Sequence, residues 1–229
     1  AELAPKAAGV RTSLGISKLA QGDQARGLKE LELAATLDPK SAEASIALIQ
    51  THMGLKQFDK ALQTVASLEK QQPDSPQVQN LKGQVYLAKG DVAGARAAWD
   101  KAVTLQPAFL PATANLARLD LQAKQPDAAK GRFLKVLEKD KNNADAMTAL
   151  AELAVVQNRP DEVTSWLEKA SNANPEAVGP ALNLGMHYIR TNQAQKALTL
   201  ARKLQPANPT HGGLLEMLGQ AQMATKDTA

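Results

Sequence analysis

The chain has 229 residues, of which 44% are apolar and only 3% aromatic, and its formal net charge at neutral pH is +4. This apolar share is enough for a hydrophobic core, and a core of Ala, Leu and Val favours closely packed helices over a sheet. The absence of cysteine excludes disulfides, thiol chemistry and cysteine-based zinc sites. No apolar run reaches the roughly 20 residues of a membrane-spanning helix, so we expect no direct insertion of these residues into a membrane.

Prolines recur along the chain in steps of 34 residues. Six of the seven positions reached by this step are proline, although the chain contains only 12 prolines. Chance does not explain such a register, and the step indicates structural repeats. Residues 1–7 are expected to be the tail of a preceding repeat, followed by repeats over 8–41, 42–75, 76–109, 110–143, 144–177 and 178–211. Residues 212–229 then form the first helix of a truncated repeat. The positions in register are Pro5, Pro39, Pro73, Pro107, Lys141, Pro175 and Pro209.

Each repeat is predicted to contain two amphipathic helices, because its apolar residues are spaced three and four apart. Gly and Asn at the break between the helices suit the left-handed conformation that ends a helix. Pro126 and Pro160 suit the first turn of the helix that follows the break. The recurring proline ends the second helix, and Pro206 is expected to shorten the last of these helices. The breaks are predicted at Gly22, Lys56, Gly90, Lys124, Asn158 and Asn192.

Small residues also recur at fixed positions. The eighth position of the repeat is small in six repeats of seven, and the twentieth is Gly, Ala or Val. Small residues let helix backbones approach closely, while apolar residues at the twenty-fourth position fill the space around the contact. These columns predict an all-α solenoid of helical hairpins in one continuous array, and the proline register disfavours a bundle with accidental periodicity. The eighth-position residues are Gly15, Ile49, Gly83, Ala117, Ala151, Gly185 and Gly219; the twentieth position includes Val163 and the twenty-fourth Trp99 and Leu167.

The columns resemble the tetratricopeptide repeat, whose signature is W-x2-L-G-x2-Y, A-x3-F and P in a 34-residue unit. The most similar segments are KGQVY (82–86) with Trp99, and LGMHY (184–188) with Ala197. The resemblance covers the whole chain and implies a right-handed superhelical solenoid of helix-turn-helix repeats. His52 and Asp120 stand where the signature has an aromatic residue, and Lys141 stands where it has proline. We expect these departures to loosen local packing.

A narrower resemblance covers residues 115–154, NLARLDLQAKQPDAAKGRFLKVLEKDKNNADAMTALAELA. This segment is similar to the arrays of bacterial PEP-CTERM/exosortase-associated tetratricopeptide lipoproteins, which accompany exopolysaccharide production and protein sorting at the Gram-negative envelope. The resemblance implies a longer, lipid-anchored parent protein in the periplasm or at the periplasmic face of the outer membrane. A cytoplasmic location is the alternative.

In this family the first helix of each repeat lines a concave groove that receives partner segments. Helical spacing places the second, fifth, ninth, twelfth and thirteenth positions on one face, and the twelfth is apolar in every repeat. We expect an apolar stripe with polar edges that binds an extended or helical peptide. Alternatively, the twelfth residue only packs against the neighbouring helix. The predicted groove residues are Met53, Asn80, Gln84, Leu87, Arg118, Leu121, Glu152, Val155, Met186 and Ile189.

The charge of this face argues against nucleic acid as a partner. Its five positions carry four acidic residues and two basic ones, whereas an RNA-binding helical repeat needs basic and base-reading side chains. A clamp for C-terminal carboxylates needs a Lys, Asn and Arg set on consecutive first helices. Only Asn115 and Arg118 form a suggestive pair, so that class of partner is disfavoured. The four acidic residues are Glu43, Asp145, Glu152 and Glu216, and the two basic ones Arg118 and Arg190.

Catalysis, metal binding and cofactor binding are not expected. Helices pack about 8–10 Å apart, so His52 and His187, four repeats from each other, cannot share a metal site or a catalytic triad. These two residues and His211 are expected to be structural, and the glycines fall on columns or caps rather than in a phosphate loop. The predicted function is a non-catalytic protein–protein interaction scaffold. The alternative is the substrate-recognition arm of a larger enzyme whose catalytic domain lies outside these residues.

The last residues, LLEMLGQAQMATKDTA (214–229), continue the register. Leu218 and Gly219 fall on the columns of Leu184 and Gly185, and Lys226 falls on the break between helices. We expect a window from a longer array in which this last helix caps the preceding repeat while residues 225–229 fray. Arrays normally end in polar capping repeats, so we expect exposed apolar surface here and weak end-to-end self-association.

Overall fold

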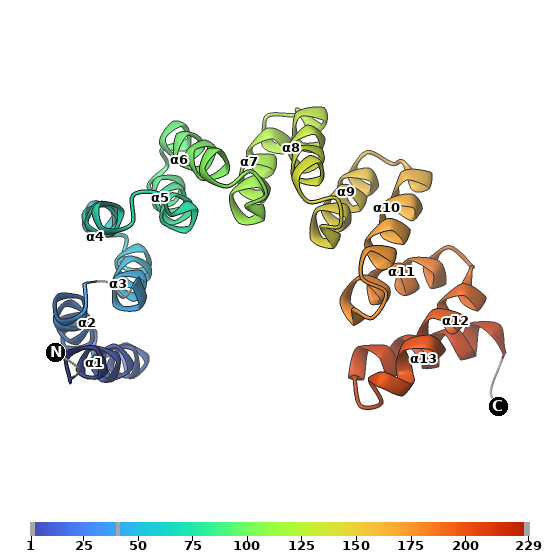
Figure 1. Cartoon of the computed structure of the whole chain (residues 1–229), viewed down its shortest axis with the longest axis horizontal. Helices are drawn as coiled ribbons and strands as arrows, with labels where there is room; N and C mark the ends of the chain where they lie inside the picture. The colour runs from blue at the N-terminus through green and yellow to red at the C-terminus, as the bar shows by residue number, and fades with distance from the viewer. Residues whose placement is uncertain (1–2, 40–41, 227–229) are drawn as a thin grey trace. The chain divides into compact units, whose positions relative to one another are not determined.

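The computed structural model describes residues 3–39 and 42–226, and over these ranges the chain is helical throughout, without a strand (Figure 1). The predicted all-α fold is therefore confirmed. The helices are α1 (Leu3–Ala20), α2 (Gln24–Leu37), α3 (Ala42–Gly54), α4 (Phe58–Gln71), α5 (Pro76–Lys89), α6 (Val92–Leu105), α7 (Leu110–Gln122), α8 (Pro126–Lys139), α9 (Ala144–Val156), α10 (Pro160–Ala173), α11 (Val178–Arg190), α12 (Ala194–Leu204), the 3-10 helix η1 (Gln205–Ala207) and α13 (Gly212–Thr225).

Neighbouring helices pack in pairs, as expected for helical hairpins. α1 packs on α2, α3 on α4, α5 on α6, α9 on α10 and α11 on α12. From α3 onward, the odd-numbered helices begin at the residues where the repeats of the sequence begin: Ala42, Pro76, Leu110, Ala144, Val178 and Gly212. The chain forms two compact units, Ala1–Leu116 and Ala117–Ala229, which are described one at a time below.

The turn inside each hairpin holds one residue in the left-handed conformation. Glycine adopts this conformation without strain because it has no Cβ, and asparagine tolerates it better than most residues. Lysine occupies the same position in two hairpins, so the requirement comes from the hairpin rather than from the residue. All six predicted breaks are confirmed by their φ angles, and Lys226 (57°) follows α13 in the same way: Gly22 (83°), Lys56 (57°), Gly90 (89°), Lys124 (57°), Asn158 (53°) and Asn192 (58°).

The close approach of α5 and α6 depends on a glycine. A Cβ on Gly83 would lie 2.4 Å from Nε1 of Trp99. The indole is buried, and its Nε1 donates a 3.1 Å hydrogen bond to the carbonyl oxygen of Asn80. The eighth position must therefore be small in this repeat, as its column predicts. Gly219, at the same position near the end of the chain, has no atom within 4 Å of a Cβ.

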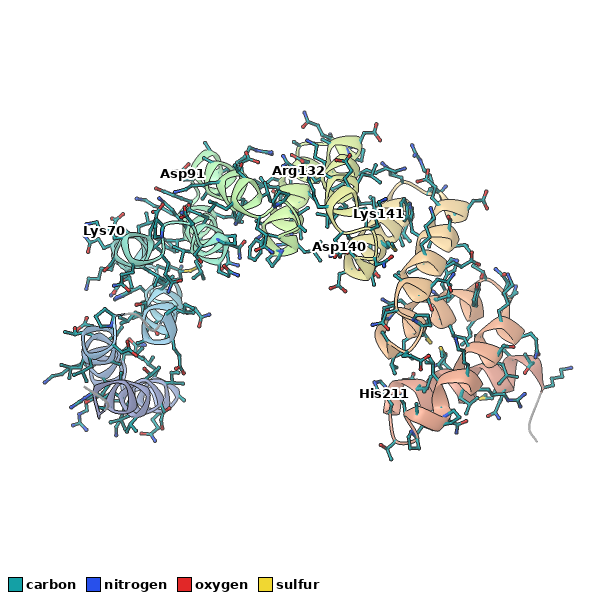
Figure 2. The ribbon with its side chains drawn as sticks, in the orientation of Figure 1. Lys70, Asp91, Arg132, Asp140, Lys141 and His211 are labelled. Atoms are coloured by element: carbon teal, nitrogen blue, oxygen red, sulfur yellow. The ribbon has the colours of Figure 1, made fainter. Side chains whose placement is uncertain are left out.

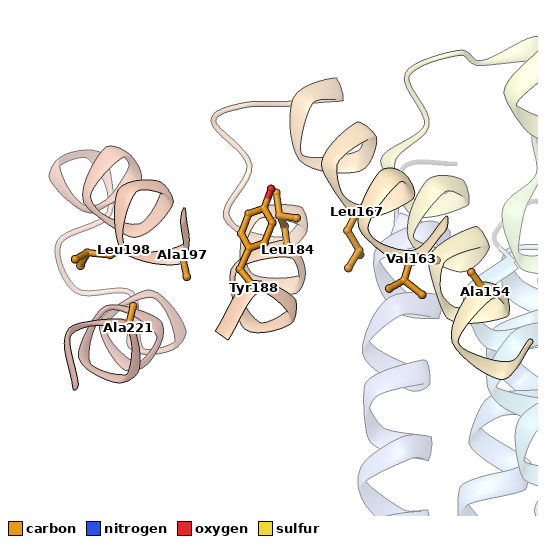
Figure 3. Packing of buried hydrophobic residues seen from close by; sticks show 9 residues of the cluster. Ala154, Val163, Leu167, Leu184, Tyr188, Ala197, Leu198 and Ala221 are labelled. Atoms are coloured by element: carbon orange, nitrogen blue, oxygen red, sulfur yellow. The ribbon is translucent and has the colours of Figure 1, made fainter. Parts of the chain in front are cut away.

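Each unit has its own apolar core between the hairpins. In the first unit, the core that joins α3, α4 and α5 consists of Ile49, Ala61, Val65, Leu68, Val78 and Val85. In the second unit, one core runs from α9 to α13 (Figure 3). Alanine supplies close helix contacts there, and larger residues fill the remaining space. The members of this core are Ala151, Ala154, Val163, Leu167, Leu184, Tyr188, Ala197, Leu198 and Ala221.

Two departures from the repeat signature are compensated by polar contacts. His52 is buried, and its Nδ1 lies 2.9 Å from Oε1 of Gln57. Asp120 is buried and forms an ion pair with Arg132, which Figure 2 shows on α8. We expected looser packing at both positions, and the structure instead has satisfied polar groups there.

The second helix of each hairpin ends two residues before the recurring proline, except in α8 and α12. α12 has 11 residues and continues into η1 at Pro206, so the predicted shortening is confirmed. α8 ends at Lys139 without a proline at position 141, because the carboxylate of Asp140 accepts hydrogen bonds from Asn142 N (3.2 Å) and Asn143 Nδ2 (3.0 Å) (Figure 2).

The first helix starts earlier than expected. α1 begins at Leu3, so residues 3–7, which we predicted to be the tail of a preceding repeat, are continuous with the helix that runs to Ala20. Pro5 is compatible with this position, because the first N–H groups of a helix have no partner within it. At the other end α13 reaches Thr225, and Lys226 has its left-handed cap geometry. Residues 227–229, where we expected fraying, lie outside the described residues.

Candidate functional site

The ten predicted groove residues lie on odd-numbered helices, and none of them belongs to the buried core. Four are exposed, namely Gln84, Arg118, Glu152 and Val155, and the other six are half-buried. The first unit contains Met53 on α3 and three residues of α5, Asn80, Gln84 and Leu87. The second unit contains Arg118 and Leu121 on α7, Glu152 and Val155 on α9, and Met186 and Ile189 on α11.

Side chains at the twelfth position of the repeat have two kinds of surroundings. Met53 and Ile189 pack, half-buried, on the cores of their units, as the packing alternative predicts. Val155 is 61% exposed and Met223 is 78% exposed, so packing does not account for these two apolar residues. Some residues of the predicted stripe therefore pack against the core and others lie on the surface, and Val155 is the exposed one on α9.

In the first unit, Asn80 is already engaged by its own chain. Its Oδ1 accepts a 3.1 Å hydrogen bond from Nδ2 of Asn115, and its carbonyl oxygen accepts the bond from Trp99. Asn80 thus connects α5 to α6 and α7, and these contacts give it a structural role. Gln84, one turn further along α5, makes no side-chain hydrogen bond among the described residues.

In the second unit, a cavity of about 310 Å³ lies between α9, α10 and α11. Three predicted residues, Glu152, Val155 and Met186, line it together. Helical spacing of three and four brings Glu152 beside Val155 and Met186 beside Arg190. We name it the α9–α11 cavity, lined by Glu152 and Val155 of α9, Val163 and Leu167 of α10, and Met186 and Arg190 of α11.

The floor of the α9–α11 cavity consists of residues from the repeat columns. Val163 and Leu167 are buried and also belong to the core shown in Figure 3. Most repeats have alanine where Val163 stands, and the sequence analysis assigned both residues to packing alone. Both residues also line the cavity, although each is almost fully buried.

The two charged residues of the α9–α11 cavity have no partner in the described part of the chain. Glu152 and Arg190 are both exposed, and neither forms a hydrogen bond or an ion pair with a described residue. They come from different helices, α9 and α11, with the apolar floor between them. From the sequence, Arg190 was counted in the charge of the face but was not predicted as a site residue. Asn183, which also lines the cavity, was not predicted from the sequence.

A second cavity of about 250 Å³ adjoins the first and shares Val155, Val163 and Arg190 with it. His187 lines this second cavity, and its Nε2 lies 2.8 Å from Oγ1 of Thr164. Burial lowers the pKa of His187, and the nearby positive charge of Arg190 lowers it further. The imidazole is therefore neutral at neutral pH, and its contact with Thr164 joins α10 to α11.

All three histidines have structural contacts, as expected. His52 contacts Gln57 and His187 contacts Thr164, while Nδ1 of His211 (Figure 2) accepts a 3.4 Å hydrogen bond from the Leu214 N–H at the start of α13. Within the described ranges, no three His, Cys, Asp or Glu side chains are grouped so as to hold a metal ion. None of the helices described here combines the length and apolar character of a membrane span.

Comparison with protein families bears on the repeats directly. Three models described as tetratricopeptide repeat match residues 18–85, 76–109 and 115–177, which together make up more than half of the chain. The chain belongs to the tetratricopeptide repeat family. The resemblance inferred from the 34-residue columns is thereby confirmed. No curated protein matches this tetratricopeptide repeat protein in sequence.

Solved structures share the fold. Yeast Tom70 has a TM-score of 0.70 at 18% identity over 99% of this chain and 48% of its own, so our protein spans about half of Tom70. PilF of Pseudomonas aeruginosa has a TM-score of 0.55 at 19% identity over 95% of this chain and 99% of its own. PilW, a widely conserved type IV pilus biogenesis factor, has a TM-score of 0.54 at 20% identity over 92% and 98% of the two chains. Likeness at these identities shows the helical repeat solenoid and nothing finer.

Proposed function

We propose that this tetratricopeptide repeat protein is a non-catalytic scaffold that binds a segment of a partner protein on the face of its odd-numbered helices. The α9–α11 cavity is the principal contact in the second unit. One observation carries the proposal: an apolar floor lies between two charged side chains that have no partner among the described residues. Apolar pockets with a few polar groups at the edge are typical of recognition sites.

The experiment that tests this proposal replaces the exposed apolar residue of the cavity. Peptides are selected from a random displayed library on the wild-type protein, and their affinities for Val155→Asp are measured. Val155 is 61% exposed, so the variant should fold, and circular dichroism checks this. Val92→Asp on α6 is the matched control, because Val92 is 49% exposed and lies in the other unit. Unchanged binding to folded Val155→Asp would contradict the proposal.

We also propose a setting for this interaction, an envelope system for exopolysaccharide production or protein sorting. The support is the similarity of residues 115–154 to tetratricopeptide lipoproteins of such systems, and the proposed location is the periplasm or the periplasmic face of the outer membrane. Fractionation of the native host tests this location. Recovery of the protein in the cytoplasmic fraction would contradict it. A catalytic domain encoded in the same reading frame would favour the alternative, a recognition arm of a larger enzyme.

A further inference from the structure

We propose that the α9–α11 cavity selects partner segments in which a basic and an acidic residue flank one apolar side chain. The inference rests on the proposed function and specifies the chemistry of the partner. The apolar side chain enters the cavity, the basic residue pairs with Glu152, and the acidic residue pairs with Arg190.

The dimensions of the cavity favour a single anchor. Its volume is about 310 Å³, at the lower end of the roughly 300–1,000 Å³ of ligand pockets. The floor is formed by Val163 and Leu167, and Val155 and Met186 stand on the two sides. Such a space accommodates an aliphatic side chain such as Leu or Met, and it is too small for the whole apolar face of a helix.

The charges on the two sides have opposite signs. Glu152 is the only charged lining residue on α9, and Arg190 is the only one on α11. Because neither has an ion pair with a described residue, each remains available to a charged group of a partner. A segment with two acidic residues would be attracted by Arg190 and repelled by Glu152. A segment with two basic residues would be attracted by Glu152 and repelled by Arg190.

Neighbouring groups do not cancel the positive charge of Arg190. The nearby guanidinium of Arg159 contacts Glu162 at 3.0 Å, and Glu162 also contacts Lys130 at 2.6 Å. Glu162 is thus already shared between two cations. His187, beside Arg190, is neutral at neutral pH. The α11 side of the cavity is therefore positive, and a polyanion such as RNA would meet Glu152 on the opposite side.

Charge reversal at one residue at a time tests the pairing. A random displayed peptide library is selected separately on the wild type, on Glu152→Lys and on Arg190→Glu. The wild type should enrich peptides with one acidic and one basic residue around an apolar one. Glu152→Lys should enrich two acidic residues, and Arg190→Glu two basic ones. A synthetic peptide from the wild-type selection should bind each single variant about fivefold to tenfold more weakly in fluorescence anisotropy.

Controls separate this inference from the proposed function. Lys135→Glu on α8 makes the same change of charge as Arg190→Glu, at an exposed lysine outside the cavity, and should leave the selection unchanged. If the selected peptides lose affinity for Val155→Asp, but the wild type, Glu152→Lys and Arg190→Glu all enrich the same charge pattern, the inference is overturned and the proposed function stays intact. Peptides indifferent to Val155→Asp would overturn both. Glu152→Gln and Arg190→Gln repeat the measurement with milder substitutions if a reversal disturbs folding.

Discussion

Glu69 of α4 and Lys82 of α5 form an ion pair, with 2.7 Å between Oε2 and Nζ. The other carboxylate oxygen of Glu69 accepts hydrogen bonds from Lys101 of α6 (2.8 Å) and from Nε2 of Gln79 (2.7 Å). One side chain thus joins three helices of the first unit. The hydrogen bonds from Lys101, Lys82 and Gln79 lower the pKa of Glu69 to about 2.

This lowered pKa makes the stability of the first unit depend on pH. The unfolded chain protonates Glu69 near pH 4.5, whereas the folded chain does so near pH 2. The contribution is therefore complete above about pH 4.5 and is lost as the pH falls towards 2. We expect Glu69→Gln to lower the free energy of unfolding by about 1–2 kcal/mol at pH 7, and by much less at pH 3. Urea unfolding at both pH values measures this, and an equal loss at the two would contradict it.

The contact between Gly83 and Trp99 predicts opposite effects for one substitution at two equivalent positions. Gly83→Ala places a Cβ against the indole and should destabilise the protein by about 1–3 kcal/mol. Gly219→Ala meets open space in a helix and should stabilise it by about 0.5–1 kcal/mol. Urea unfolding of the two variants is compared with that of the wild type. If Gly83→Ala stabilised the protein, α5 and α6 would be able to move apart without a loss of stability, and the prediction would be wrong.

The buried ion pair between Asp120 and Arg132 should show strong coupling. Arg132→Met leaves Asp120 without this cation and should destabilise the protein by about 3–5 kcal/mol. The double variant Asp120→Leu, Arg132→Met should lose less free energy of unfolding than the two single variants lose together, because it also removes the buried carboxylate. A double-mutant cycle in urea measures the difference. Additive losses would mean that the two side chains do not depend on each other.

The apolar surface of α13 should support weak self-association. Met223 is 78% exposed and Leu215 is 42% exposed on this helix. We expect the mean mass in light scattering to rise with concentration, and Met223→Asp to reduce that rise. Leu134→Asp on α8, where Leu134 is 37% exposed, is the control. A wild-type protein that stays monodisperse and monomeric at high concentration would contradict the expectation.

The sequence alone determined the local features of the repeat. Left-handed residues at Gly22 and Asn158, the shortened α12 at Pro206 and the small residue at Gly83 were all predicted correctly. Each depends on backbone sterics within a few residues or on a column that recurs along the chain, so a single sequence contains the information. Pro5 shows the limit of such reasoning, because a proline is compatible both with a helix end and with a first turn.

Only the tertiary structure decided which residues form the candidate site. Asn80 and Glu152 share a predicted face, yet Asn80 is hydrogen-bonded to Asn115 while Glu152 has no partner among the described residues. Periodicity assigns a side chain to a face of its own helix, but whether a neighbouring helix covers that side chain depends on packing between repeats. Val155 is exposed and Ile189 is half-buried at the same position of the repeat for this reason. Glu152, Arg190, Val163 and Leu167 line one cavity from three helices, and no single helical period predicts this arrangement.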